Sequence, residues 1–157
     1  MTVTIRPAGQ GDIPAVADLI EEIERFCGAV EIQPIDERRT LIEQALFGSP
    51  PLAAALLGVD TNSSIAGLAA YAFLWLAKGT THSLFLEELY VWESLRQQGI
   101  GARLMAELRR VAAGRPGCGR LEWMTDRSNP AARGFHKSPG FAEFEGKVVC
   151  RIDASTV

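Results

Sequence analysis

The segment Arg96-Gln97-Gln98-Gly99-Ile100-Gly101 is the part of the sequence best suited to hold a phosphate group. It lies between an apolar run that ends near Val91 and a helix-like run that begins near Gly101. Glycine has no Cβ, so backbone N–H groups can come close to a bound group. The first turn of a helix also carries unpaired N–H donors and a partial positive charge. The segment therefore indicates a phosphate-binding loop, although it is equally typical of a turn that only begins a helix.

Two adjacent carboxylates, Glu87 and Glu88, lie in the apolar segment Leu86–Val91 just before this loop. Neighbouring side chains on a strand point to opposite faces, so we expect one of the two to enter a cleft or to meet a partner. A partly buried carboxylate has a raised pKa and can accept a proton, directly or through water. The alternative interpretation is a solvated residue or a structural ion pair.

His136 is the other candidate for proton transfer, because an imidazole titrates near neutral pH. A single histidine on a short helix is more commonly a surface or capping residue. Asn129 precedes the same helix-like run, and an N-cap explains it without any function. Neither residue predicts an activity by itself.

Motifs of several other chemistries are absent from the sequence. The Gly99–Gly101 pair lacks the third glycine and the later acidic residue of a dinucleotide-binding fingerprint, and no Gly-Lys-Ser/Thr follows it as in an NTPase P-loop. No Gly-x-Ser-x-Gly nucleophile elbow occurs. The 3 cysteines are far apart without a Cys-x-x-Cys pair, and there are 2 histidines. We therefore expect neither a disulfide framework nor a metal site.

Charge and hydropathy restrict the partners of the chain. A net charge of −3 and a pI near 5.4 argue against a nucleic-acid-binding surface and are compatible with a cationic substrate. The first residues lack the layout of a signal peptide, and the longest apolar run, 65–77, is too short to cross a bilayer. We expect a cytoplasmic protein that binds neither nucleic acid nor a membrane.

The elements that would position these residues follow from the periodicity of the apolar residues. Helical spacing predicts four helices, over 12–27, 36–47, 101–113 and 130–137. Alternating or continuous apolar runs predict strands over 2–6, 52–59, 65–76, 81–91, 120–125, 142–144 and 147–152. The second and third of these strands, joined by a polar five-residue loop, predict an antiparallel hairpin. The predicted fold is α+β, with about four helices on a mixed central sheet of about seven strands in a single domain, 1–157.

This order of elements, with three motifs in sequence, resembles the GNAT superfamily of acetyl-CoA-dependent N-acetyltransferases. The segment Arg96–Gly101 matches the pyrophosphate loop of the superfamily, Gln/Arg-x-x-Gly-x-Gly/Ala. Leu86–Val91 is similar to the preceding strand, which carries a bulge in the family. The segment from Asn129 to Phe141 is similar to the motif Asn-x-x-Ala-x-x-Phe-Tyr-x-x-x-Gly-Phe. The resemblance spans nearly the whole chain, and Leu86–Val91 is also similar to the diamine (spermidine/spermine-type) acetyltransferases.

The resemblance implies that acetyl-CoA is the co-substrate. Backbone N–H groups of the loop would bind the CoA pyrophosphate, and the backbone of Leu89 and Val91 would pair with the pantetheine arm beside a bulge at Glu87–Val91 that splays the strands. The Leu89 N–H would polarise the thioester carbonyl, and Glu87 corresponds to the general base. The implied cofactor-binding residues are Leu89, Tyr90, Val91, Arg96, Gln97, Gln98, Gly99, Ile100, Gly101, Ala102, Asn129 and Phe135.

The chain departs from the family pattern at three positions. His136 stands where the family has a tyrosine that protonates the leaving CoA thiolate. A thiol with a pKa of about 8.5 leaves without strong acid help, so His136 as the general acid and a reaction without one both remain open. Gln97 stands where glycine is common, and Glu93 where proline is common. Neither change removes a backbone donor.

We therefore predict direct acetyl transfer from acetyl-CoA to a primary amine. Small-molecule acceptors such as a polyamine, an amino acid or an antibiotic are favoured. The alternatives are a non-catalytic acetyl-CoA-binding or sensor domain, a protein N-terminal or lysine acetyltransferase, and a partner-binding domain that takes no CoA. We expect residues 26–35 and 78–82 to line the acceptor pocket, and we expect a homodimer.

Overall fold

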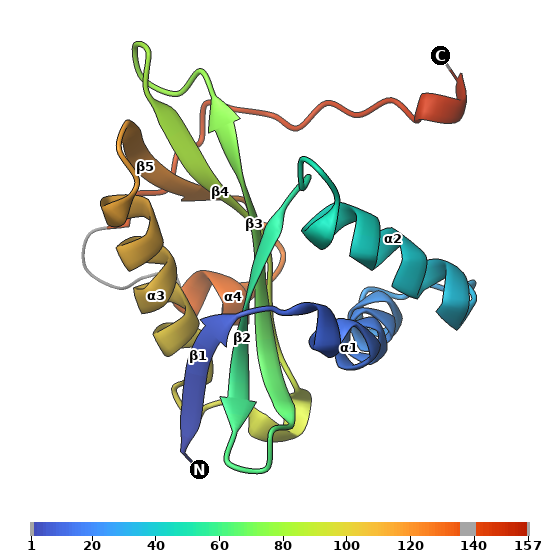
Figure 1. The fold of residues 1–157 in the computed structure, drawn as a ribbon. Helices are drawn as coiled ribbons and strands as arrows, with labels where there is room; N and C mark the ends of the chain where they lie inside the picture. Colours follow the sequence, from blue (N-terminus) through green and yellow to red (C-terminus); the bar gives the residue numbers. More distant parts are fainter. Residues whose placement is uncertain (1, 136–140, 157) are drawn as a thin grey trace. The chain divides into compact units, whose positions relative to one another are not determined.

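The computed structural model describes residues 2–135 and 141–156. They fall into two compact units that divide between Met124 and Thr125. Among the described residues, the first unit holds five strands and three α-helices, and the second holds one short α-helix (Figure 1). The strands are β1 (Val3–Pro7), β2 (Ala54–Asp60), β3 (Ile65–Trp75), β4 (His82–Val91) and β5 (Cys118–Trp123). The helices are α1 (Ile13–Phe26), α2 (Ile35–Phe47), α3 (Ile100–Gly114) and α4 (Pro130–Phe135).

The strands of the first unit form one sheet in the order β1-β2-β3-β4-β5. Strands β1 to β4 pair antiparallel, and β4 pairs parallel with β5. The predicted hairpin is confirmed as β2 and β3, in which Leu57 lies opposite Leu68. Because parallel neighbours need a crossover connection, the chain between β4 and β5 contains α3.

Helices cover both faces of this sheet, with α1 and α2 on one face and α3 on the other (Figure 1). Side chains alternate along a strand, so Leu57 faces α1 and α2 while its neighbour Gly58 faces α3. A Cβ on Gly58 would lie 3.2 Å from Ile100 Cγ2, which shows how closely the start of α3 approaches β2. The core between the sheet and α1–α2 contains Val16, Ala17, Leu19, Ile23, Ile42, Ala55, Leu57, Val59, Leu68 and Tyr90.

Helices α1, α2 and α3 begin and end within one residue of the predicted positions. In α1, Val16, Leu19 and Ile23 form the buried stripe that their three- and four-residue spacing predicts. The chain leaves α1 through Gly28, whose φ of +87° is a conformation that glycine adopts readily. The sequence thus determines these helices locally.

The expected number of strands is not found in the described residues, where the sheet has five strands. Alternation predicts further strands over 142–144 and 147–152, but no strand is assigned to residues 141–153. The reason is that a strand requires ladder hydrogen bonds with a neighbour, whereas alternation supplies only a propensity. The α+β class with four helices is confirmed. The last predicted positions of the fourth helix, 136–137, lie outside the described residues.

Candidate active site

Strand β4 carries a bulge at Glu87. Ala70 of β3 lies opposite Glu88, whereas the next residue, Tyr71, lies opposite Leu86. Glu87 is therefore the extra residue in the register of the two strands. An extra residue bends its strand and increases the local twist. The bulge falls within the segment predicted from the sequence, Glu87–Val91.

The pairing of β4 with β5 ends where this bulge begins. The two strands pair from His82 to Leu86, and the last pair joins Leu86 and Trp123. In the part of the chain that the structure describes, residues 88–91 of β4 pair with β3, and residues 87–91 have no strand partner on the β5 side. A stretch of strand edge is left open next to the bulge.

The backbones of Leu89 and Val91 face this open edge. The Trp92 N–H donates to the Ala66 carbonyl of β3 at 3.2 Å, so the polar backbone groups of Trp92 point towards β3. Backbone groups point to alternate sides along an antiparallel strand. Those of Val91 and Leu89 consequently point away from β3, which is the orientation required for pairing with a bound pantetheine arm.

The two glutamates differ in their exposure to solvent. Glu87 is exposed at the bulge, and Glu88 is half-buried. Burial raises the pKa of the Glu88 carboxyl, the neighbouring Glu87 charge raises it further, and a hydrogen bond from the Leu89 backbone opposes the change. The resemblance assigned no role to Glu88, whose carboxyl has the pKa that burial raises. Strand alternation alone could not identify it, because the bulge determines the local register.

The loop after β4 leads into α3 through two residues with left-handed backbone. After a 3-10 turn, Glu93–Leu95, Gln97 has φ +61° and Gly99 has φ +78°. Gly99 is the N-cap residue of α3, and no side chain caps this end among the described residues. The first turn, which begins at Ile100, also carries no acidic residue. Its free N–H groups, from residues 100–102, form an arrangement suited to an anion.

Arg96, the first residue of the predicted loop, contacts both α1 and β4 through its guanidinium. Its Nε donates to the Val91 carbonyl oxygen at 3.1 Å. The guanidinium carbon lies 4.8 Å from the centre of the Phe26 ring and 5.1 Å from that of Tyr90. The side chain thus lies between the end of α1 and the end of β4. Its contact with pyrophosphate stays a prediction.

The Tyr90 side chain is buried against α1. Its ring meets Phe26 edge-on with the centres 5.7 Å apart, and its hydroxyl donates to Glu22 Oε1 at 3.3 Å. Burial raises the pKa of the Tyr90 hydroxyl, and the negative charge of Glu22 adds to this effect. The Tyr90 side chain therefore belongs to the contact between α1 and the sheet.

Within the segment 26–35, which we expect to line the acceptor pocket, residues 27–34 connect α1 to α2. A buried arginine attaches this connection to α1. Arg38 of α2 has a side chain that is 5% exposed. Its guanidinium donates to the Ala17 carbonyl at 3.1 Å, to Glu21 Oε2 at 3.0 Å and to the Gln33 carbonyl at 2.7 Å. The sequence did not single out this residue, because a buried arginine on a charged helix has no local signature.

Asn129 and Phe135 lie in the second unit, at the start and the end of α4. Asn129 Oδ1 accepts a hydrogen bond from the Ala132 N–H at 3.0 Å, which confirms that it caps the helix. Arg133 of the same helix pairs with Glu143 at 2.9 Å. His136 lies outside the described residues, and its role as a general acid stays a prediction.

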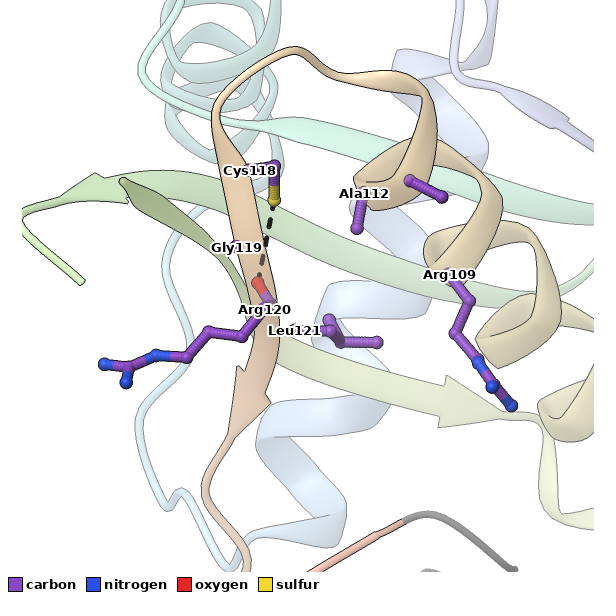
Figure 2. Close-up of a pocket in the computed structure, with 7 residues that line it drawn as sticks. Arg109, Ala112, Cys118, Gly119, Arg120 and Leu121 are labelled. Atoms are coloured by element: carbon purple, nitrogen blue, oxygen red, sulfur yellow. Dashed lines mark hydrogen bonds between the residues drawn. The ribbon is translucent and has the colours of Figure 1, made fainter. Parts of the chain in front are cut away.

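A pocket of about 220 Å³ lies in the first unit between the second half of α3 and β5 (Figure 2). Figure 2 shows Arg109 and Ala112 of α3 beside the β5 residues, where the Cys118 thiol lies 3.6 Å from the Arg120 carbonyl oxygen. The lining residues are Arg109, Ala112, Ala113, Cys118, Gly119, Arg120 and Leu121. This pocket contains none of the predicted site residues and lies at the opposite end of α3 from the loop.

Nowhere in 2–135 and 141–156 do three His, Cys, Asp or Glu side chains gather so that they could bind a metal ion. Over the same ranges, no helix has the length and apolarity needed to cross a bilayer.

Comparison with known proteins identifies the family. The model of the acetyltransferase (GNAT) family matches residues 14–141, which include the bulged strand, the loop and the Asn129 segment. The chain belongs to the GNAT acetyltransferase family. The predicted resemblance and the predicted enzyme class are thereby confirmed.

Individual relatives of this GNAT chain match it over most of its length. It is 27% identical over 150 residues to the thialysine N-epsilon-acetyltransferase of Sus scrofa, covering 88% of this chain and 84% of the relative. An integron cassette protein from the mobile metagenome of V. cholerae has a TM-score of 0.85 at 24% identity, covering 98% and 93% of the two chains. An aminoglycoside N-acetyltransferase solved with CoA has a TM-score of 0.77 at 21% identity, covering 96% and 95%. The two structural likenesses show the shared fold.

Proposed function

We propose that this chain transfers an acetyl group from acetyl-CoA to the primary amine of a small molecule. The observation that carries the proposal is the continuity of the open strand edge and the uncapped helix. Strand β4 loses its β5 partner at Glu87, and a few residues later the chain enters the free N-terminus of α3. A strand edge can pair with an extended arm that contains amides, and a helix N-terminus suits a pyrophosphate.

The residues of the first unit fit an acetyl-CoA molecule at these two places. When bound, acetyl-CoA supplies the thioester that carries the acetyl group. The backbones of Leu89 and Val91 would hold its pantetheine arm, and the N–H groups of residues 97–102 would hold its pyrophosphate. A Cβ at Gly99 would meet no atom within 4 Å, so the backbone there is open to a ligand. The cofactor contacts of Tyr90, Arg96, Asn129 and Phe135 rest on the resemblance.

A carboxylate at the bulge is the proposed general base. An ammonium ion has no lone pair, so the acceptor must lose a proton before its nitrogen attacks. We assign this role to Glu87, which is exposed at the bulge and can act through water. Glu88 provides the direct comparison, because burial raises the pKa of its carboxyl towards the range in which a base works best. His136 is the proposed acid for the thiolate.

A small cationic acceptor is supported by the names of the relatives. One is a thialysine N-epsilon-acetyltransferase and another is an aminoglycoside N-acetyltransferase, and both names specify a small molecule with amino groups. The carboxylates at the bulge would attract such a cation. We therefore favour a diamine, an amino acid with a side-chain amine, or an antibiotic amine over a protein N-terminus or lysine.

An amine-panel assay tests this function. The chain is incubated with acetyl-CoA and thialysine, lysine, spermidine, an aminoglycoside or a lysine-containing peptide, and products are read by mass spectrometry together with free thiol. We expect acetylation of one of the small amines. Acetylation of the peptide alone would favour a protein acetyltransferase. If the chain binds acetyl-CoA but no amine in the panel causes release of free CoA thiol, the sensor domain is favoured. If the chain does not bind acetyl-CoA, the partner-binding domain is favoured.

The base is tested with matched amide substitutions. Glu87→Gln should lower kcat by roughly 10²–10⁴, with the Kd for acetyl-CoA unchanged in calorimetry. Glu43→Gln, on the exposed side of α2, is the control. Turnover of Glu87→Gln at the wild-type rate would contradict the assignment, and loss of turnover in Glu88→Gln instead would transfer the role to Glu88.

We further propose that residues 1–157 form one acetyltransferase domain that acts as a homodimer in the cytoplasm. The single domain is supported by the length of the family match, 14–141. The homodimer rests on the resemblance, and the compartment on the composition of the chain. Sedimentation equilibrium should give twice the mass of one chain, and the mass of a single chain would contradict the dimer.

A further inference from the structure

One side chain connects the expected acceptor segment with the cofactor loop. The Arg96 guanidinium lies over the rings of Phe26 and Tyr90, at 4.8 and 5.1 Å from their centres. Phe26 is the last residue of α1 and the first residue of the expected acceptor segment, 26–35. Arg96 is the first residue of the loop that leads to α3. The cation–π contacts therefore join the end of α1 to the start of the loop.

The same guanidinium also binds the open edge of β4. Arg96 Nε donates to the Val91 carbonyl oxygen at 3.1 Å, and this carbonyl faces the edge proposed for the pantetheine arm. Phe26 is 56% exposed, so the core does not enclose its ring. Its contacts with Tyr90 and Arg96 attach this ring to β4. A planar guanidinium can lie over two rings while its Nε donates to a carbonyl, which a lysine ammonium reproduces only in part.

We propose that Arg96 is a positioning residue that holds the Phe26 end of α1, and with it the acceptor segment, against the acetyl-CoA-binding edge of β4. This inference rests on the proposed function. It differs from a role in binding pyrophosphate, because an arginine that only binds pyrophosphate affects the KM of acetyl-CoA and leaves the amine untouched. A positioning Arg96 determines the KM of the amine as well.

Steady-state kinetics separate these two roles. Arg96→Ala should raise the KM of the amine about tenfold, which corresponds to about 1.4 kcal/mol, with a smaller change in kcat. Arg96→Lys should recover part of this loss, because an ammonium can still lie over an aromatic ring. The control is Arg103→Ala, which removes an exposed positive charge from the first half of α3. This control should leave the KM of the amine unchanged. If Arg96→Ala raises only the KM of acetyl-CoA, the proposal is overturned.

A double-mutant cycle tests whether Arg96 acts through Phe26. If it does, Arg96→Ala and Phe26→Ala together should raise the KM of the amine by clearly less than the product of their separate effects. The same cycle can be applied to the free energy of unfolding in urea, a measurement that does not require enzyme activity. Independent effects in both cycles would overturn the positioning role. If no amine causes release of free thiol from acetyl-CoA, the proposed function is overturned. The unfolding cycle would still report on the contact between Arg96 and Phe26, so failure of the proposed function and failure of the positioning role are distinguishable.

Discussion

Removal of the buried Arg38 guanidinium should destabilise the first unit and loosen the acceptor segment. Arg38 donates to the Ala17 and Gln33 carbonyls at 3.1 and 2.7 Å, and its side chain is 5% exposed. Hydrogen bonds from a charged donor contribute about 1.5–3 kcal/mol each, so the loss of two gives about 3 kcal/mol at the lower limit. The predicted cost includes no contribution from the Arg38–Glu21 ion pair, because Glu21 is partly exposed and retains its pair with Arg25 at 2.7 Å. The predicted cost of Arg38→Ala is thus about 3 kcal/mol.

Urea unfolding followed by circular dichroism measures this cost. At constant m-value, the midpoint shift gives the change in the free energy of unfolding, and the Tm should fall by roughly 6–12 °C for a chain of this size. Arg25→Ala is the matched control, since Arg25 is 61% exposed in its side chain and bonds to the same Glu21. It should cost less than about 1 kcal/mol.

A third variant separates the hydrogen bonds of Arg38 from the packing of its aliphatic stem. Arg38→Met keeps much of the stem and removes every donor, so it should cost nearly as much as Arg38→Ala. If Arg38→Met has wild-type stability, or if Arg38→Ala costs no more than Arg25→Ala, the reasoning from the buried carbonyls is refuted. In an active enzyme, Arg38→Ala should also raise the KM of the amine more than that of acetyl-CoA.

Three further predictions concern the bulge, the loop and α3. Because burial raises the pKa of the Glu88 carboxyl, the stability that this group contributes is present at low pH and is lost as the pH rises through its folded-state pKa. Glu88→Gln should therefore be more stable than wild type in urea at pH 7, with the gain vanishing near pH 4; an equal gain at both values would contradict the burial argument. Gln97→Gly should change the unfolding free energy by less than about 1 kcal/mol, because relief of the left-handed backbone offsets the added chain entropy. Gln97→Val should cost about 1–2 kcal/mol in the same measurement, and equal stability of the two variants would argue against the φ of +61°. Leu104→Ala, at a position that is 0% exposed, should cost about 2–5 kcal/mol in urea unfolding, whereas a loss below about 1 kcal/mol would show that α3 does not pack there.

Local patterns in the sequence determined the helices and the first four strands of the sheet. The stripe of Val16, Leu19 and Ile23 has one stable solution, a helix with that face buried. The polar loop between the apolar runs of β2 and β3 likewise predicts their hairpin. The start of α3 after the segment from Arg96 to Gly101 was predicted in the same way, because a helix start depends on a few neighbouring residues.

Tertiary structure decided the features that depend on residues far apart in the chain. The position of the bulge follows from the register of β4 against β3, so only pairing shows that Glu87 is the extra residue and that Glu88 is half-buried. The contact of Arg96 with Phe26 joins residues 70 positions apart. The sequence predicts strands over 142–144 and 147–152, but no strand is assigned to these described residues. Non-local pairing carries a loop-closure cost and needs a partner with matching backbone groups, and a single sequence records neither.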